Sequence, residues 1–283
     1  MHEYFGKLNT SLPRFMYNNR PIGIFDSGIG GLTVANAINK LLPDESIIYF
    51  GDTAHLPYGD KSAESIKQYA EKITAFLIEK NCKLVVIACN TASSVAYNNV
   101  EKLTSHTAIA INVIDPVASY VAKHFSNSKV GVIGTKGTIN SRVYARKINS
   151  LNNTIEVTSL ATPLLAPMVE EGYFNNHISQ TIINSYLSKK SLKNIKALIL
   201  ACTHYPLIKP EVENYYKNAV TIIDSAEIVA SFVKKKLGNN KAAGGNRKPK
   251  HLFYVSDYTE SFEKSTKIFF KNKIHLDEVR IWD

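Results

Sequence analysis

The chain has 283 residues, three cysteines and a formal net charge of +10. This length allows one large or two modest domains, since domains commonly contain about 100 to 200 residues. The cysteines (Cys82, Cys89 and Cys202) are too few and scattered for a disulfide framework, which indicates free thiols in a reducing compartment. The first 20 residues contain no apolar signal core, and no stretch reaches the roughly 18 apolar residues of a membrane span. We therefore expect a cytoplasmic protein without a membrane segment.

The positive charge is concentrated in "KKKLGNNKAAGGNRKPK" (234–250), which holds seven cations and no acid. It contains glycines typical of a loop but no aromatic residues for base stacking. We interpret it as a helix C-terminus, where cations are favourable, followed by a solvated loop. We therefore expect no nucleic-acid partner, although a basic nucleic-acid-binding protein is one alternative function.

Short apolar, β-branched runs recur between longer amphipathic stretches. The runs are 22–25, 46–50, 84–88, 108–114, 129–134, 155–160, 197–201, 220–224 and 252–256. Between them the spacing predicts helices such as 32–41, 63–80, 116–124, 177–189 and 228–237. Strands that alternate with helices indicate a parallel sheet covered on both faces. We therefore predict an α/β fold.

Three pairs of similar segments repeat along the chain. They are "IGIFDSGIGG" (22–31) with "VGVIGTKGTI" (130–139), "LVVIACNTAS" (84–93) with "ALILACTHYP" (197–206), and "NVIDPV" (112–117) with "TIIDSA" (221–226). The offsets are 130 − 22 = 108, 202 − 89 = 113 and 224 − 115 = 109 residues. Repeats in the same order at a nearly constant offset indicate two similar structural units.

We therefore predict two pseudo-symmetric lobes, each a mostly parallel sheet flanked by helices. Residues 1–20 would form an N-terminal extension, residues 21–115 with 225–283 the first lobe, and residues 116–224 the second. The last strand and helix (252–270) would return to the first lobe. Because ligands of open α/β sheets bind beyond the carboxyl ends of the strands, the active site would lie in the cleft between the lobes.

Each Ala-Cys sequence places a thiol at the end of a buried strand. If the lobes face one another about a pseudo-twofold axis, Cys89 and Cys202 approach one cleft from opposite sides. A thiol has a pKa of about 8.5, which a helix N-terminus or a nearby cation can lower toward neutrality. Two opposed acid/base groups suit removal of a proton from one face of a carbon and its delivery to the other. The pattern predicts racemisation or epimerisation, whereas Cys82 is expected to pack as a small apolar side chain.

Other chemistries fit these residues less well. The loop "FDSGIGG" (25–31) lacks the third glycine of a dinucleotide site and the lysine of a Walker loop, and Asp26 would repel a phosphate. Asp26 is better interpreted as an acid/base assistant or an amine contact. A zinc site built from Cys89, Cys202, His204 and His55 lacks ligands at two-to-four-residue spacing, so we expect no metal. His204 is instead a candidate acid/base partner.

Seven segments in order resemble the glutamate racemase family, a family of cofactor-independent isomerases that supply D-glutamate for peptidoglycan. They are "IGIFDSGIGGLTV", "YFGDTAHLPYG", "IACNTASS", "IGTKGTI", "PLLAPMVEEG", "LACTHYPLI" and "IIDSA". The resemblance spans roughly residues 20 to 270. It agrees with the duplication, which by itself indicates two opposed thiols and proton transfer at a carbon but not glutamate.

The resemblance implies roles for individual residues. Cys89 would be the base toward D-glutamate and Cys202 the base toward L-glutamate. Asp26 would assist the first thiol, and His204 and Glu170 the second. Glu171 adjoins Glu170, and either carboxylate could face the cleft. The substrate contacts would be Asp26, Ser27, Tyr58, Gly59, Asn90, Thr91, Thr135, Thr138, Thr203 and His204.

The resemblance further implies a cytoplasmic homodimer that racemises glutamate without a cofactor and thereby serves cell wall biogenesis and cell shape. No lysine lies in a recognisable pyridoxal phosphate motif, which agrees with the expected absence of a cofactor. A racemase of aspartate or a hydantoin on the same fold is the main alternative. The segments "DSGIGG" and "CTHYP" favour glutamate.

Overall fold

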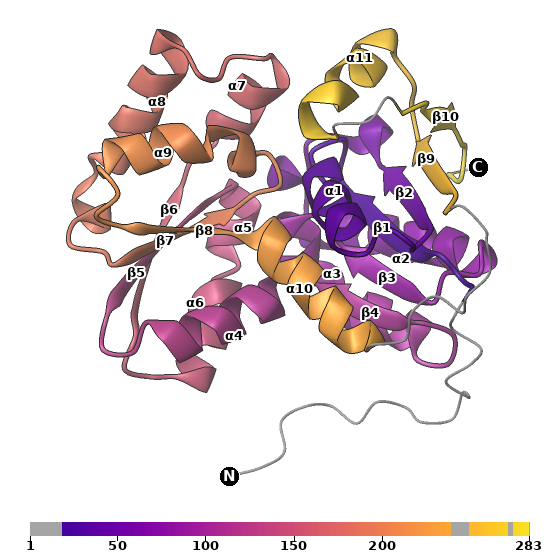
Figure 1. Ribbon diagram of the computed structural model, residues 1–283, viewed down its shortest axis with the longest axis horizontal. Coiled ribbons are helices and arrows are strands. Elements are labelled where there is room, and N and C mark those ends of the chain that lie inside the picture. Colours follow the sequence, from indigo (N-terminus) through magenta and orange to yellow (C-terminus); the bar gives the residue numbers. More distant parts are fainter. Residues whose placement is uncertain (1–18, 239–248, 271–273, 283) are drawn as a thin grey trace.

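The structure is a computed structural model that describes residues 19–238, 249–270 and 274–282, and it has an α/β architecture (Figure 1). Within these residues one sheet has six strands, in the order β10-β9-β2-β1-β3-β4, and the other has four, in the order β6-β5-β7-β8. All strand pairs are parallel. The predicted fold class is confirmed. We call the elements around the six-stranded sheet the first lobe and those around the four-stranded sheet the second lobe.

The strands have the following bounds: β1 Ile22–Asp26, β2 Ile47–Gly51, β3 Leu84–Ile87, β4 Ile109–Asn112, β5 Lys129–Gly134, β6 Glu156–Ala161, β7 Ala197–Ala201, β8 Thr221–Asp224, β9 His251–Val255 and β10 Asp277–Glu278. The α-helices are α1 Leu32–Leu41, α2 Ala63–Glu79, α3 Asn90–Thr104, α4 Ile114–His124, α5 Lys136–Asn140, α6 Val143–Leu151, α7 Leu165–Glu170, α8 His177–Leu187, α9 Lys209–Tyr215, α10 Ser225–Leu237 and α11 Glu260–Phe269. Short 3₁₀ helices include Thr53–His55, Tyr58–Asp60 and Tyr205–Ile208.

Four strands of the first sheet have the same order as the four strands of the second sheet, which agrees with the sequence repeat. In the first lobe the order β2-β1-β3-β4 places the strand before the glycine loop beside the strand before Cys89. In the second lobe the order β6-β5-β7-β8 does the same for the strand before Thr135 and the strand before Cys202. Each thiol therefore follows the third strand of its lobe, next to the loop that follows the first strand.

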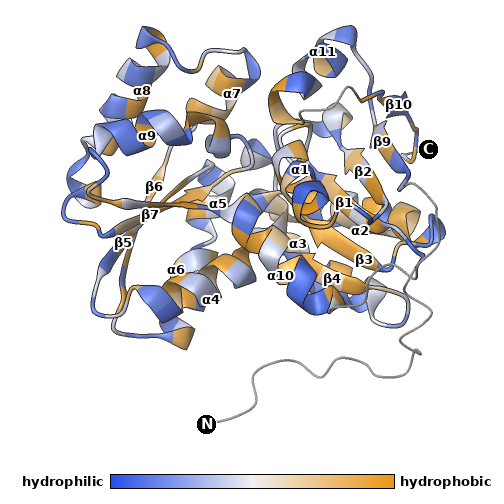
Figure 2. Ribbon diagram, in the orientation of Figure 1, coloured by the Kyte–Doolittle hydropathy of each residue, from blue (hydrophilic) through white to orange (hydrophobic). Residues whose placement is uncertain are grey.

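The central strands of both sheets are largely apolar, and the helices turn polar faces outward (Figure 2). Strands β1, β2, β3 and β7 are buried at every position, as expected for parallel strands that are covered on both faces. Helix α10 packs on α1 of the first lobe and on α4 of the second, so it joins the two lobes (Figure 1). One apolar cluster accordingly contains residues of both sheets, including Val86 and Leu200.

The structure extends the predicted elements at several points. Strand β9 joins the first sheet beside β2, and α11 follows it, as expected for a C-terminal segment that returns to the first lobe. A further strand, β10, pairs with β9 and was not predicted. Helix α10 begins at Ser225, three residues before the predicted start, because the Asp224 side chain caps it by accepting a hydrogen bond from the amide of Ala226. The residue limits of the lobes stay a prediction.

Two features of the sequence lie largely outside the described residues. These are residues 1–18 of the proposed extension and residues 239–248 of the basic segment. The part of the basic segment that is described, Lys234 to Lys236, forms the last turn of α10. Among the helices of the described residues, none combines the length and apolar character needed to cross a membrane.

Candidate active site

A pocket lies between the lobes, at the carboxyl ends of their central strands. It encloses about 470 Å³, part of which is open to solvent. Both Cys89 and Cys202 line it, together with residues from the loops that follow β1, β2 and β5 and from helix α7. Its lining residues are Ser27, Leu56, Pro57, Tyr58, Gly59, Cys89, Asn90, Thr91, Thr135, Ala166, Pro167, Glu170, Ala201, Cys202, Thr203 and His204.

Cys89 is held at the start of helix α3 by two hydrogen bonds. Its Sγ accepts from the amide of Ala92 at 3.4 Å and donates to Oγ of Ser27 at 3.7 Å. The thiol is 5% exposed. Burial, assisted by the negative charge of Asp26, raises the pKa of Cys89 to about 12 against the opposing effect of the Ala92 amide. Burial and Asp26 therefore outweigh the amide at the helix N-terminus, and Cys89 carries its proton at neutral pH in the substrate-free protein.

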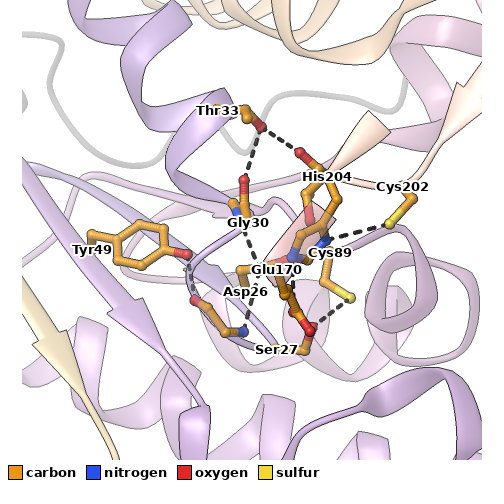
Figure 3. Close-up of polar contacts among 12 residues, drawn as sticks. Asp26, Ser27, Gly30, Thr33, Tyr49, Cys89, Glu170, Cys202 and His204 are labelled. Atoms are coloured by element: carbon orange, nitrogen blue, oxygen red, sulfur yellow. Dashed lines mark hydrogen bonds and ion pairs between the residues drawn. The ribbon is translucent and has the colours of Figure 1, made fainter. Parts of the chain in front are cut away.

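Cys202 stands at the head of a chain of polar contacts in the second lobe. Its Sγ lies 3.6 Å from Nδ1 of His204, whose Nε2 lies 2.9 Å from Oε1 of Glu170 (Figure 3). Burial alone would lower the pKa of His204, but the hydrogen bonds and charges of Cys202 and Glu170 raise it well above 6.5. An imidazolium beside the Cys202 sulfur is thus favoured at neutral pH.

Asp26 lies beneath the pocket rather than in its wall. Its Oδ2 accepts from the amides of Gly28 and Gly31 at 3.2 and 2.9 Å, while Oγ1 of Thr203 lies 3.5 Å from its Oδ1 (Figure 3). Burial raises its pKa, although His204 and the backbone amides oppose that effect. Within the described residues, the hydrogen-bond partners of the Cys89 sulfur are Ser27 and Ala92, so Asp26 acts on this thiol through its charge.

Three threonine hydroxyls form a triangle across the cleft. Oγ1 of Thr91, next to the first thiol, lies 2.9 Å from that of Thr135 and 3.2 Å from that of Thr138, and the last two are 3.1 Å apart. The side chain of Thr138 is buried behind the other two and does not line the pocket. Such hydroxyls can both donate and accept, so they suit a polar substrate group.

Asn90 offers a free amide to the pocket. Its Oδ1 accepts a hydrogen bond from the hydroxyl of Tyr144, on helix α6 of the other lobe, at 2.7 Å. Its Nδ2 is buried and has no hydrogen-bond partner among the described residues. Because a buried donor without a partner is costly, this amide is a ready donor for an anionic or carbonyl oxygen in the pocket.

The loop that carries Tyr58 is supported by a buried carboxylate outside the pocket wall. Asp52 accepts from the hydroxyl of Tyr58 at 2.6 Å, from Ser256 at 2.7 Å and from Nδ1 of His55 at 2.8 Å. The His55 ring in turn stacks on Tyr69 and meets the edge of Trp282 at a centroid distance of 4.5 Å. The C-terminal tail, through Trp282, therefore takes part in holding the loop that carries Tyr58.

The structure brings most predicted site residues together. Every predicted site residue lines the pocket except Asp26 and Thr138, which lie directly behind it. Glu170 lines the pocket and contacts His204, whereas the side chain of Glu171 is exposed, which answers the question left open between them. His55 is engaged with Asp52 outside the pocket lining, and among the described residues no group of three or more His, Cys, Asp and Glu side chains could hold a metal ion. Cys82 is fully buried in the first lobe.

Several contributors were not predicted from the sequence. They are the apolar wall residues Leu56, Pro57, Ala166, Pro167 and Ala201, and the supporting residues Asp52, Tyr144 and Thr33. All five wall residues lie inside segments that carry the family resemblance, as do Asp52 and Thr33, whereas Tyr144 does not. The resemblance assigns no role to these residues, and their contacts join distant parts of the chain, which the sequence pattern does not reveal.

The pocket can perform acid/base chemistry on a small polar molecule. It combines a protonated thiol at Cys89, a second thiol beside an imidazolium at Cys202, and donors such as the Asn90 amide. The two thiols come from corresponding positions of opposite lobes, so a carbon between them would meet one sulfur on each face.

Comparison with known proteins agrees with this geometry. The model of the Asp/Glu/hydantoin racemase family matches residues 27–233. A glutamate racemase of Chlorobaculum parvum is 41% identical over 88% of this chain and 92% of its own length, and one of Geobacter metallireducens is 40% identical over 90% and 94%. The crystal structure of Francisella tularensis glutamate racemase in complex with D-glutamate has a TM-score of 0.87 and 39% identity, covering 94% of this chain and 99% of that one.

The family model covers most of the chain, and the relatives match it along nearly their whole lengths with the same arrangement of sheets. This chain therefore belongs to the Asp/Glu/hydantoin racemase family of isomerases, in the branch of its glutamate racemases.

Proposed function

We propose that this protein interconverts L- and D-glutamate without a cofactor and so supplies D-glutamate for peptidoglycan synthesis. The observation that carries the proposal is the entry of Cys89 and Cys202 into one pocket from equivalent positions of two lobes. The similar proteins are glutamate racemases, and one of them was crystallised in complex with D-glutamate. The Asn90 amide and the threonine hydroxyls can bind the carboxylates of such a substrate.

The proposed reaction moves protons between carbon and sulfur. The Cys202 thiolate removes the α-proton of L-glutamate, which leaves a carbanion at the α-carbon and a neutral thiol at Cys202. The Cys89 thiol then gives its proton to the opposite face, which forms D-glutamate and leaves a thiolate at Cys89. The resting electrostatics favour this direction, because His204 carries positive charge beside Cys202 while burial and Asp26 keep Cys89 protonated. Reverse turnover begins with the thiolate at Cys89.

The proposed binding residues divide between the two ends of the pocket. Ser27, Asn90, Thr91 and Thr203 lie beside the two thiols and would bind the α-carboxylate and α-amine. Tyr58, Gly59 and Thr135 lie on the loops that face them and would surround the side chain of the substrate. Thr138 would act through Thr91 and Thr135, and Asp26 through its charge.

The substrate can be tested by circular dichroism. Protein treated with chelator and freed of pyridoxal phosphate should bring either glutamate enantiomer to an optically inactive mixture. Aspartate and a hydantoin serve as the competing substrates. Faster racemisation of either competitor, or an absolute need for a metal or pyridoxal phosphate, would overturn the proposal.

The two-thiol mechanism predicts where the new α-proton comes from. Protiated L-glutamate in deuterium oxide should give D-glutamate that carries deuterium from the first turnover, because the donor thiol has already exchanged with solvent. Mass spectrometry of the D-glutamate formed at low conversion measures this. Cys89→Ala and Cys202→Ala should each lose at least about two decades of activity, the usual scale of acid/base catalysis, while Cys82→Ala stays active. Protium retained at the α-carbon would indicate a single base.

We also propose that the protein is a cytoplasmic homodimer. The three free cysteines support a reducing compartment. Light scattering on the purified protein measures the assembly, and a monomer at assay concentration would contradict the dimer. Fractionation of cells that express the chain tests the location, with activity expected in the fraction that holds soluble cytoplasmic enzymes.

A further inference from the structure

Thr33 links the two lobes behind the active site. It lies in the first turn of helix α1 in the first lobe and is 9% exposed. Its Oγ1 lies 3.0 Å from the carbonyl oxygen of Gly30 and 3.0 Å from that of Thr203, in the loop that carries the second thiol (Figure 3). Thr33 does not line the pocket, so it does not touch a substrate there.

The hydroxyl of Thr33 has two acceptors but a single proton. The carbonyl of Gly30 belongs to the same lobe and remains within reach whatever the second lobe does. The carbonyl of Thr203 is within reach only while the lobes are together. If the lobes separated, the hydroxyl could turn back to Gly30 and keep a hydrogen bond, so this link would break without leaving the hydroxyl unsatisfied.

The Thr203 carbonyl belongs to the peptide unit that leads into His204. In the described part of the chain, Thr33 is the hydrogen-bond donor to that carbonyl. The same loop segment is confined from the first lobe by Gly30, since a Cβ added there would lie 2.5 Å from Cε1 of His204. The ring of Phe269, on α11, packs against the ring of His204 in an edge-to-face arrangement, with the two centroids 5.5 Å apart.

We propose that Thr33 is a positioning residue that sets His204, and through it Cys202, only when the lobes are closed. The inference rests on the proposed racemase function and deepens it. Closure would bring Thr33 against the Thr203 carbonyl, fix the peptide before His204, and place its imidazole between Cys202 and Glu170. The second acid/base group is then assembled at the same moment as the pocket.

The test compares Thr33→Val, which replaces the hydroxyl with a methyl group of similar size, with Thr33→Ser, which keeps the hydroxyl. Thr74→Val is the matched control, because the Thr74 hydroxyl is also buried in the first lobe and bonds a carbonyl of its own helix, that of Ala70. Thr33→Val should lower kcat about tenfold with little change in KM, the size expected for one lost hydrogen bond that holds a reactive group. Thr33→Ser and Thr74→Val should stay within about twofold of the unchanged protein.

A second readout separates positioning from general destabilisation. Without Thr33 to hold it, His204 loses part of its contact with Cys202, so its raised pKa falls and the alkaline limb of the kcat profile moves to lower pH. Thr33→Ser and Thr74→Val should leave that limb in place. A Thr33→Val protein with an unchanged kcat and pH profile would refute the proposal, and so would an equal loss in Thr74→Val.

A third readout needs no substrate and keeps this proposal distinct from the proposed function. Iodoacetamide labelling followed by peptide mass spectrometry gives the rates at Cys202 and Cys89 separately. Thr33→Val should change the ratio of the two rates by at least about threefold, while Thr33→Ser and Thr74→Val leave it unchanged. If the unchanged protein fails to racemise glutamate, the proposed function fails while the labelling comparison still decides the role of Thr33. An unchanged ratio refutes that role.

Discussion

The two thiols occupy opposite electrostatic surroundings although the repeat gives them equivalent places in the fold. Cys89 has the carboxylate of Asp26 nearby, and burial with that charge keeps it protonated. Cys202 has the imidazole of His204, whose pKa is raised by its contacts with Cys202 and Glu170 against the effect of burial. The two thiols therefore meet charges of opposite sign before any substrate arrives, as the proposed two-thiol mechanism requires.

The neighbouring glutamates allow a matched test of this asymmetry. Glu170→Gln removes the carboxylate 2.9 Å from Nε2 of His204 and should lower kcat about tenfold, whereas Glu171→Gln changes an exposed side chain and should not. Because Glu170 raises the pKa of His204, its loss lowers that pKa, and the imidazolium disappears at a lower pH. The deficit should therefore grow as the pH rises from about 7 to about 9 in a profile of kcat.

A deficit that stays constant with pH would show that Glu170 holds His204 in place without controlling its charge. An equal loss in Glu171→Gln would contradict the assignment of Glu170 as the pocket carboxylate.

At the scale of elements, each thiol loop contacts the first loop of the opposite lobe. Thr91, in the first turn of α3 beside Cys89, bonds Thr135, which follows β5, and Thr138 in α5. Thr203, beside Cys202, contacts Asp26 at the end of β1 and Thr33 in the first turn of α1. The surroundings of both thiols are therefore completed by residues of the opposite lobe.

These contacts between the lobes also mark the limit of what could be predicted from the sequence. The nine longer strands follow from their apolar runs, and the two thiols follow from the repeat, because both signals are local or periodic. Strand β10 was missed because its two residues, Asp277 and Glu278, are charged and exposed. Thr33 was missed because its partner is 170 residues away, and a threonine in a helix gives no sign of a contact across a cleft. The pKa of Cys89 was also outside reach, because it depends on burial that only the assembled lobes produce.

At the scale of the whole molecule, the first lobe buries a thiol that takes no part in the site. Cys82 is fully buried against Gly23 beneath the sheet, and burial raises its pKa to about 12 against the effect of Arg20. An unfolded chain loses this proton near pH 8.5 on the reference scale. The folded protein therefore binds a proton that the unfolded chain has released, and this contribution to stability is present below about pH 8.5 and is lost as the pH rises toward about 12.

The free energy of unfolding should accordingly fall between about pH 8 and about pH 10.5, measured by urea denaturation. Cys82→Ala should be less stable at neutral pH but should show a smaller fall with pH, because the titrating group is gone. Val100→Ala is the control, since it removes packing from the same apolar cluster and leaves every thiol in place. An identical pH dependence in Cys82→Ala and Val100→Ala would show that Cys82 does not contribute to the alkaline loss.

The packing of the C-terminal tail against His55 gives the protein a built-in optical reporter. Trp282 is the only tryptophan in the sequence, and its ring meets the edge of an imidazole that bonds Asp52, the carboxylate that also holds the pocket tyrosine, Tyr58. Imidazole groups quench indole emission on contact, so the Trp282 signal depends on where the Tyr58 loop holds His55. Titration of glutamate against Trp282 fluorescence therefore tests whether occupancy of the pocket moves this loop, without a label and without turnover.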